Sequence, residues 1–278
     1  MPDLLHRLKI NTTLARRILT GFIADQIAKA GAKGAVIGLS GGIDSAVSAY
    51  LSVEALGAKN VLAVRMPYRT SSESSMTDAD AVIAELGIPA VTAPITDMAD
   101  ALIHQFPDMS DVRRGNIMAR MRMIVLYDQS AARSLLPMGT SNKTEFLLGY
   151  STLYGDSGVA LQPIADLYKA QVRQLAQDIG VPKQIIDKPP SADLWEGQTD
   201  EGELGFTYND VDQVLYLLVD ERYTVEQTVS EGFDASFVNS VWGRVKSNHY
   251  KRTMPNIPKL GSRAIGHDFL YLRDYTGR

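Results

Sequence analysis

The chain has 278 residues, of which 45% are hydrophobic and 22% charged, as in an ordinary globular protein. It carries 28 basic and 32 acidic residues with interspersed signs, whereas binders of nucleic acid concentrate basic surface. The chain lacks cysteine, which excludes disulfides, thiolate metal sites and cysteine nucleophiles. Its longest uncharged stretch, Leu86 to Thr96, has 11 residues, against about 20 needed to span a bilayer. Without a signal-peptide pattern in Met1 to Lys9, we expect a cytoplasmic protein with no membrane or nucleic-acid partner.

The first two thirds of the chain alternate helix-like and strand-like patterns. Helical apolar spacing predicts helices over Thr12 to Ala30, Ile43 to Leu56, Thr77 to Leu86, Asp111 to Arg133 and Asp166 to Ile179. Short apolar runs predict strands over Ala35 to Leu39, Val61 to Met66, Ala90 to Ala93 and Ser134 to Gly139. Strands that alternate with helices form parallel sheets with right-handed crossovers. The pattern therefore predicts an α/β fold with an open parallel sheet flanked by helices.

The pattern changes after Pro189 and Pro190. Ser191 to Gly205 is rich in glycine and acidic residues without apolar periodicity, which predicts a long mobile loop. Helices are expected over Tyr208 to Val219 and Ala235 to Ser247, followed by a tail, Asn248 to Leu260, that is too rich in proline for a helix. We expect a single domain over residues 1–278, comprising an N-terminal helix (1–33), a parallel α/β core (34–190), the loop (191–205), and C-terminal helices with a tail (206–278).

The most informative motif lies between the first predicted strand and the next helix, and reads Gly38-Leu39-Ser40-Gly41-Gly42-Ile43-Asp44-Ser45. Glycines allow several backbone N–H groups to converge, and the helix N-terminus adds positive dipole, so the motif predicts a cradle for phosphates. It is no Walker A loop, because no lysine follows the glycines, and it lacks the glycine spacing of a dinucleotide fold. A carboxylate facing phosphates indicates a bridging Mg²⁺ at Asp44. The simpler alternative is a tight turn in which Asp44 interacts with the helix dipole.

The Ser-Gly-Gly-x-Asp-Ser motif resembles the pyrophosphate loop of the N-type ATP pyrophosphatases, which have an adenine nucleotide alpha-hydrolase-like fold. Further segments resemble the NAD synthetase family, in the family's order. They are Arg114 to Met123 (RGNIMARMRM), Gly139 to Glu145 (GTSNKTE), Tyr154-Gly155-Asp156, Lys188 to Leu194 (KPPSADL), Gly197 to Glu201 (GQTDE) and His249 to Arg252 (HYKR).

This resemblance implies roles for individual residues. The ATP-binding set comprises Gly38, Leu39, Ser40, Gly41, Gly42, Ile43, Asp44, Ser45, Thr140, Lys169 and Ser191. Asp44 and Glu145 would bind Mg²⁺, and Lys169 would stabilise charge on the departing pyrophosphate. Arg120, Tyr250 and Lys251 match contacts to deamido-NAD, and Asp156 matches the acid that holds or deprotonates ammonium.

Most of these assignments have a simpler alternative. Glu145 could be a capping acid in the first turn of a helix, and Thr140 an ordinary turn residue. Lys169 and Lys251 could be solvated lysines, and Asp156 a plain turn aspartate. The arginines that flank Arg120 cannot all face one site, because residues two apart lie on different sides of a helix.

Two positions depart from the ammonia-dependent members of the family, because Leu153 and Ala160 stand where that subgroup has a lysine and an acid that contact the dinucleotide. The segment Ser-Thr-Leu-Tyr-Gly-Asp is more similar to the corresponding segment of glutamine-dependent members, whose amidase domain uses a cysteine nucleophile. Because this chain has no cysteine, we expect it to take free ammonia, or ammonia from a separate glutaminase.

The resemblance therefore implies an ammonia-dependent NAD synthetase, a ligase that amidates deamido-NAD through an acyl adenylate and releases AMP and pyrophosphate. It also implies a homodimer with the Asp111 to Arg133 helix at the interface. Two alternatives stay open: another amide-forming ATP pyrophosphatase of the GMP synthetase kind, and a non-catalytic regulator that binds adenine nucleotides.

Overall fold

The computed structural model describes residues 2–191, 199–253, 255–262 and 264. Within these ranges the centre is a parallel sheet of four strands, β1 (Gly34–Gly38), β2 (Val61–Arg65), β3 (Ala90–Thr92) and β4 (Leu135–Met138). Their order is β3-β2-β1-β4, with Ala35 of β1 opposite Val61 of β2 and Leu136 of β4. The strand order reverses between β1 and β4, and open α/β sheets bind ligands at the carboxyl ends of such strands.

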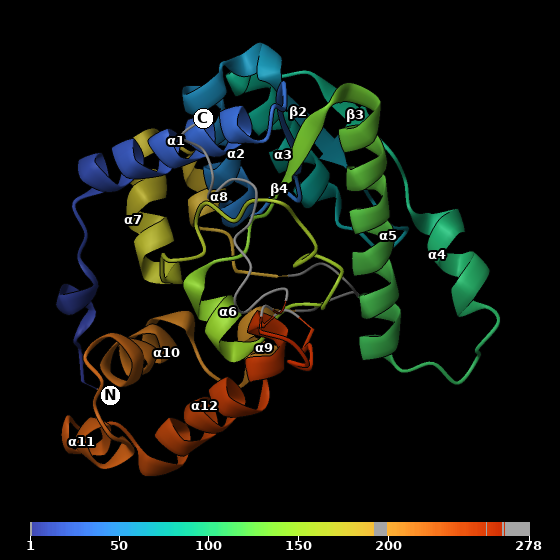
Figure 1. Cartoon of the computed structure of the whole chain (residues 1–278). Coiled ribbons are helices and arrows are strands. Elements are labelled where there is room, and N and C mark those ends of the chain that lie inside the picture. The colour runs from blue at the N-terminus through green and yellow to red at the C-terminus, as the bar shows by residue number, and fades with distance from the viewer. Residues whose placement is uncertain (1, 192–198, 254, 263, 265–278) are drawn as a thin grey trace.

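Helices cover both faces of this sheet (Figure 1). Alternate side chains of a strand point to opposite faces, so Ala35 and Ile37 are buried in one core cluster and Val36 in another. The first cluster receives side chains from α1 (Thr12–Lys29), α2 (Ile43–Leu56), α3 (Glu73–Leu86) and α7 (Lys169–Ile179). The second receives side chains from α4 (Thr96–Ile103) and α5 (Asp111–Arg133).

A third cluster lies among the C-terminal helices, below the sheet in Figure 1. The shorter elements are α6 (Lys143–Leu148), α8 (Lys183–Ile186), α9 (Asp200–Leu204), α10 (Tyr208–Leu215), a π-helical turn (Tyr216–Asp220), α11 (Val225–Ser230), α12 (Ala235–Ser247), and three 3-10 turns (Leu5–Leu8, Ala58–Asn60, His249–Arg252). Leu8 at the N-terminus packs with Tyr208 and Val241 in this cluster. The N-terminal segment therefore packs against the C-terminal helical part.

The predicted fold class is confirmed, and most predicted elements are present with small differences in their bounds. The helix predicted from Asp166 begins at Lys169, because the Gln171 side chain accepts a hydrogen bond from the Tyr168 amide and makes Tyr168 the N-cap. Helix α3 begins at Glu73 rather than Thr77, because the Ser72 side chain caps it by accepting from the Ser75 amide.

The prediction of a loop over Ser191 to Gly205 is partly wrong. Residues 192–198 lie outside the described residues, but Asp200–Leu204 form α9, which Thr199 caps by accepting from the Gly202 amide. Helix α10 ends at Leu215 and continues as the π-helical turn, instead of running to Val219. The tail prediction also missed the single 3-10 turn at His249–Arg252.

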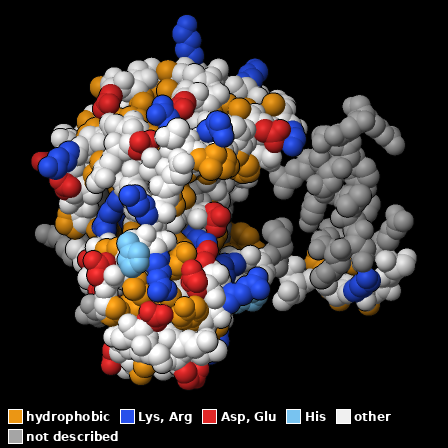
Figure 2. All heavy atoms as spheres, turned by 90° about the vertical axis from the view of Figure 1, so that its left-hand side faces the viewer, with side chains coloured by type: hydrophobic (Ala, Val, Ile, Leu, Met, Phe, Trp, Pro, Cys, Tyr) orange, Lys and Arg blue, Asp and Glu red, His pale blue; other side chains and the backbone are white. Residues whose placement is uncertain are grey.

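The surface carries both signs of charge. On the face shown in Figure 2, lysine and arginine side chains are intermixed with aspartate and glutamate side chains. None of the helices in the described ranges combines the length and apolarity that crossing a bilayer requires.

Candidate active site

The glycine-rich loop connects β1 to α2 at the carboxyl end of the sheet. Gly41 has φ +77°, and a Cβ there would lie 2.2 Å from the backbone oxygen of Ser75, so only glycine fits. The Gly42 amide donates to Ser40 Oγ (3.2 Å), and Ser45 Oγ donates to the Gly42 carbonyl (2.9 Å). Gly42 is the N-cap of α2 and brings no side chain to cap it. The first turn of α2 thus presents its amides and dipole to an anion.

Two carboxylates converge beside this loop around one lysine. Lys169 at the start of α7 forms an ion pair with Asp44 of α2, and its Nζ lies 3.6 Å from Glu145 Oε1. Asn142 donates from Nδ2 to both carboxylates, at 3.0 Å to Asp44 and 2.8 Å to Glu145. Asn142 and Glu145 also form the capping box of α6. The helix cap therefore fixes the position of Glu145. A capping role for Glu145 is thus compatible with its place in the site beside Asp44.

Burial and charge set the pKa values of this group. Burial alone would lower the pKa of Lys169, but Asp44 and Glu145 outweigh it and raise that pKa, so the side chain is an ammonium. Burial, and next the charge of Asp44, raises the pKa of Glu145 against the attraction of Lys169. Asp200 of α9 is also buried, which raises its pKa, and it receives hydrogen bonds from Tyr150 (3.2 Å) and Tyr208 (3.1 Å). Three acids, Asp44, Glu145 and Asp200, thus face one lysine, and the raised pKa values show that this group disfavours having all three acids charged at once.

The donor set fits a hard divalent cation. Carboxylate oxygens are the ligands that Mg²⁺ takes, commonly one or two carboxylates together with the phosphates of a nucleotide. Within the described ranges, no three His, Cys, Asp or Glu side chains converge as a metal site. A cation at Asp44 and Glu145 would therefore complete its shell with substrate oxygens and water, as suits a Mg²⁺ that arrives with a nucleotide.

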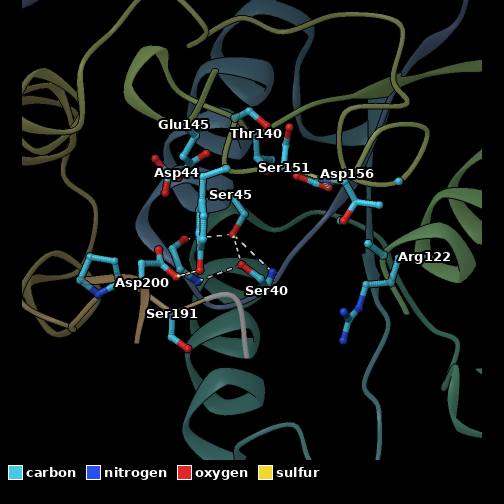
Figure 3. Close-up of a pocket in the computed structure, with 18 of the residues that line it drawn as sticks. Ser40, Asp44, Ser45, Arg122, Thr140, Glu145, Ser151, Asp156, Ser191 and Asp200 are labelled. Carbon is cyan, nitrogen blue, oxygen red and sulfur yellow. Dashed lines mark hydrogen bonds between the residues drawn. The ribbon is translucent and has the colours of Figure 1, made fainter. Parts of the chain in front are cut away.

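Asp44, Glu145, Lys169 and Asp200 line one cavity of about 590 Å³, a size typical of sites for small ligands. Figure 3 shows Asp44 and Glu145 together on one side of it and Asp156 with Arg122 on the other. The cavity continues along Tyr150 and Ser151 to Lys251 and the α12 residue Arg244. The glycine-rich loop and its acids thus lie at one end of the cavity, and Asp156 lies at the other.

Asp156 is the acid of the second end. It accepts a hydrogen bond from the Thr152 amide (2.7 Å) and borders the cavity, where solvent reaches it. Desolvation by the surrounding protein raises the pKa of Asp156, although the hydrogen bond from the Thr152 amide and the charge of Lys251 act in the opposite sense. Lys251 donates to the carbonyls of Gly149 (2.6 Å) and Ser151 (2.8 Å). It therefore holds the turn before Asp156 while bordering the same cavity.

Most residues singled out from the sequence meet in this cavity. Its lining includes Gly38, Leu39, Ser40, Gly42, Ile43, Asp44, Ser45, Thr140, Glu145, Asp156, Lys169, Ser191 and Lys251. Three others lie elsewhere. Gly41 packs behind the loop against Ser75, Tyr250 is 58% exposed, and Arg120 donates to the Leu153 carbonyl (3.2 Å) beside a separate groove with Phe106.

Sequence reasoning missed three polar residues of the site. Arg122 borders the cavity and donates to the Met66 carbonyl (3.1 Å), and its two-residue offset from Arg120 on a helix was the available signal. Asn142 and Asp200 lie inside motifs that the resemblance had already marked. Asn142 contacts Glu145 within its own capping box, whereas its contact with Asp44, and the approach of Asp200 to these acids, join segments that are distant in the sequence.

The reversal point of an open parallel sheet, with an anion loop beside an acidic pair, defines a nucleotide-binding α/β protein. A family model for NAD synthase matches residues 15–255. The NH(3)-dependent NAD(+) synthetase of Trichlorobacter lovleyi is 55% identical over 269 residues, 97% of this chain and 98% of that protein. That of Chlorobaculum tepidum is 52% identical over 262 residues, 94% and 95% of the two chains.

Solved structures agree with these relatives. The NH3-dependent NAD synthetase of Campylobacter jejuni matches with a TM-score of 0.77 and 33% identity, over 90% of this chain and 100% of that one. A structure titled NMN synthetase, from Francisella tularensis, matches with the same TM-score and identity, over 90% and 99%. The chain belongs to the NAD synthase family, which confirms the resemblance seen in its motifs.

Proposed function

We propose that this chain is a ligase that amidates deamido-NAD with ammonia at the expense of ATP, giving NAD, AMP and pyrophosphate. The observation that carries the proposal is the group of Asp44, Glu145 and Lys169 beside the phosphate loop, in a chain of this family. A carboxylate is a poor acyl donor, so amidation requires that its oxygen first become a leaving group. ATP supplies that leaving group when the carboxylate attacks the α-phosphate and pyrophosphate departs.

We assign the following roles, which the arrangement of the site supports. The amides at the start of α2, with Ser40 and Ser45, bind the departing phosphates, and the Lys169 ammonium stabilises their charge. Asp44 and Glu145 would hold Mg²⁺, which supplies charge neutralisation at the phosphates. Thr140 and Ser191 also line the cavity within the ATP-binding set.

The second half of the reaction takes place at the Asp156 end of the cavity. A carboxylate there attracts ammonium and can accept its proton, so that ammonia attacks the acyl carbon and AMP departs. We assign deamido-NAD to this end, near Lys251, and retain Arg120 and Tyr250 as contacts contributed at a subunit interface.

We also propose a homodimer built on α5. This helix exposes Val112 (61%), Ile124 (51%) and Tyr127 (42%), and a second copy would cover these side chains. Arg120 borders a groove on this helix. In a dimer built on α5, this groove would lie at the subunit interface, and Arg120 would then lie near the bound dinucleotide. We further propose a single domain over residues 1–278, a cytoplasmic location, and ammonia that is free or delivered by a separate glutaminase.

The test measures NAD and pyrophosphate together, with ATP, Mg²⁺ and ammonium, with and without deamido-NAD. Equal amounts of both products that require deamido-NAD would support the proposal. A parallel reaction contains nicotinate mononucleotide, because the Francisella tularensis structure is titled NMN synthetase. Preferred turnover of the mononucleotide would favour that second function. Neither product from folded, ATP-binding protein would overturn both, and would leave the regulator or another amide-forming ligase.

A further inference from the structure

Asp212 is a fully buried carboxylate on α10, outside the cavity lining. Its two oxygens bind two different segments of the chain. Oδ1 accepts from Thr144 Oγ1 at 2.5 Å, and Oδ2 accepts from the Ala170 amide at 2.8 Å. A hydroxyl and a backbone amide, rather than a basic side chain, thus satisfy this charge among the described residues.

Both partners of Asp212 are neighbours of residues in the proposed site. Thr144 precedes Glu145 in the first turn of α6, and Ala170 follows Lys169 at the start of α7. The Lys169 amide donates to Thr144 Oγ1 at 3.1 Å, which closes a ring of contacts. The first amides of a helix have no partner within the helix, so these two bonds satisfy two of them from outside α7.

We propose that Asp212 is a positioning residue that fixes Glu145 and Lys169 relative to each other by holding Thr144 and the first amides of α7. The proposal rests on the proposed function, in which these two side chains act on the same phosphates. Their separation, 3.6 Å from Nζ to Oε1, depends on how α6 and α7 are joined. Asp212 links the two helices from α10, and Asp220 of the π-helical turn makes a second, more exposed link to Lys143 and Tyr168.

The chemistry of the link requires a carboxylate. Both Asp212 oxygens accept hydrogen bonds, whereas an asparagine offers one acceptor and one donor. In Asp212→Asn, the Thr144 hydroxyl hydrogen loses its acceptor or the Ala170 amide does. Burial raises the pKa of Asp212, against the hydrogen bonds from Thr144 and Ala170, so the fold disfavours its charged form.

The experiment compares four variants of the full chain. Asp212→Asn and Thr144→Val break the ring of contacts. Thr144→Ser keeps the hydroxyl and should therefore retain function. Asp210→Asn is the matched control, because Asp210 lies on the same helix and accepts from a threonine hydroxyl, that of Thr207, at 2.6 Å near solvent. Steady-state kinetics of NAD formation are combined with hydrogen exchange of the peptide that contains Lys169 and Ala170.

A displacement of about 1 Å in an active site can cost about 10²-fold in rate, so we expect kcat to fall by about that factor in Asp212→Asn and Thr144→Val. The KM for deamido-NAD should change less than about twofold, because its end of the cavity is untouched. Hydrogen exchange of the peptide should accelerate in the same two variants, and Thr144→Ser and Asp210→Asn should match the unaltered chain.

Unchanged kcat in Asp212→Asn would overturn the proposal. So would a loss of kcat that only follows the unfolded fraction measured by circular dichroism, or an equal loss in Asp210→Asn. Hydrogen exchange needs no turnover, and it therefore separates this proposal from the proposed function. If the unaltered chain makes no NAD, the function fails, while unchanged exchange in both ring-breaking variants would still refute the role of Asp212.

Discussion

Replacing Gly41 with alanine should displace the phosphate loop. The new Cβ would lie 2.2 Å from the Ser75 backbone oxygen, and Cβ contacts under 3.0 Å essentially do not occur, so the loop must move by about 0.8 Å. Left-handed backbone adds about 1–2 kcal/mol for alanine. Because a displacement near 1 Å can cost about 10²-fold in rate, we expect kcat/KM for ATP to fall by about that factor. Initial rates of pyrophosphate release measure it.

Gly57→Ala is the matched control for this prediction. Gly57 is the C-cap of α2, the helix that follows the phosphate loop, and its φ of +82° is close to the +77° of Gly41. Nothing lies within 4 Å of the position that a Cβ at Gly57 would take. Both variants place a side chain at a positive φ, which Gly57 combines with a ψ of 148°, and only Gly41→Ala meets the Ser75 oxygen. The loop argument would be refuted if both variants lost stability equally and both retained kcat/KM for ATP.

Three further predictions concern other parts of the molecule. Arg252→Ala removes hydrogen bonds to three backbone carbonyls of α6 and α12, and because bonds from charged donors contribute about 1.5–3 kcal/mol, chemical denaturation should show a loss of that order; an unchanged midpoint would count against this capping role. Arg122 borders the Asp156 end of the chain's own cavity, where we assign deamido-NAD, so Arg122→Ala should lower kcat/KM for deamido-NAD by about tenfold or more even in the monomer. Arg120 borders the separate groove on α5, so Arg120→Ala should matter only in the dimer; an equal effect of Arg120→Ala in monomer and dimer would contradict its place at the interface. Burial raises the pKa of Asp212 from 3.8 to about 6, so its protonated form is favoured on folding, and the free energy of unfolding should gain about 1 kcal/mol from this group as pH falls from about 7 to 5. Asp212→Asn should lack that gain, and parallel pH dependences of the two proteins would refute it.

The sequence predicts the sheet well, because β1 and β2 are short apolar runs between helices with clear periodicity. It does not predict α6, which has six residues and depends on partners distant in the chain. Arg252 binds carbonyls at its end, and Asn248 donates to the Leu148 carbonyl at 3.0 Å. Tertiary contacts of this kind leave no periodic pattern.

The residues of the candidate site also differ in how far the sequence predicts them. Ser40 and Asp44 lie in a contiguous motif whose conformation is local, so the residues alone indicate an anion site. Glu145 and Lys169 are distant in sequence, and only the resemblance brought them together before the structure placed them around Asp44. Asp212 lies in an unremarkable amphipathic helix, and its contacts depend on how α10 packs against α6 and α7.

The most direct test of the account uses deamido-NAD labelled with ¹⁸O in its nicotinate carboxylate. If that carboxylate attacks the α-phosphate and ammonia then displaces AMP, one carboxylate oxygen must leave in AMP. Mass spectrometry should therefore find one ¹⁸O in each AMP formed and none in pyrophosphate, with Glu145→Gln forming little of either product. Label in inorganic phosphate with formation of ADP, or unlabelled AMP beside newly formed NAD, would contradict activation of the carboxylate by adenylation.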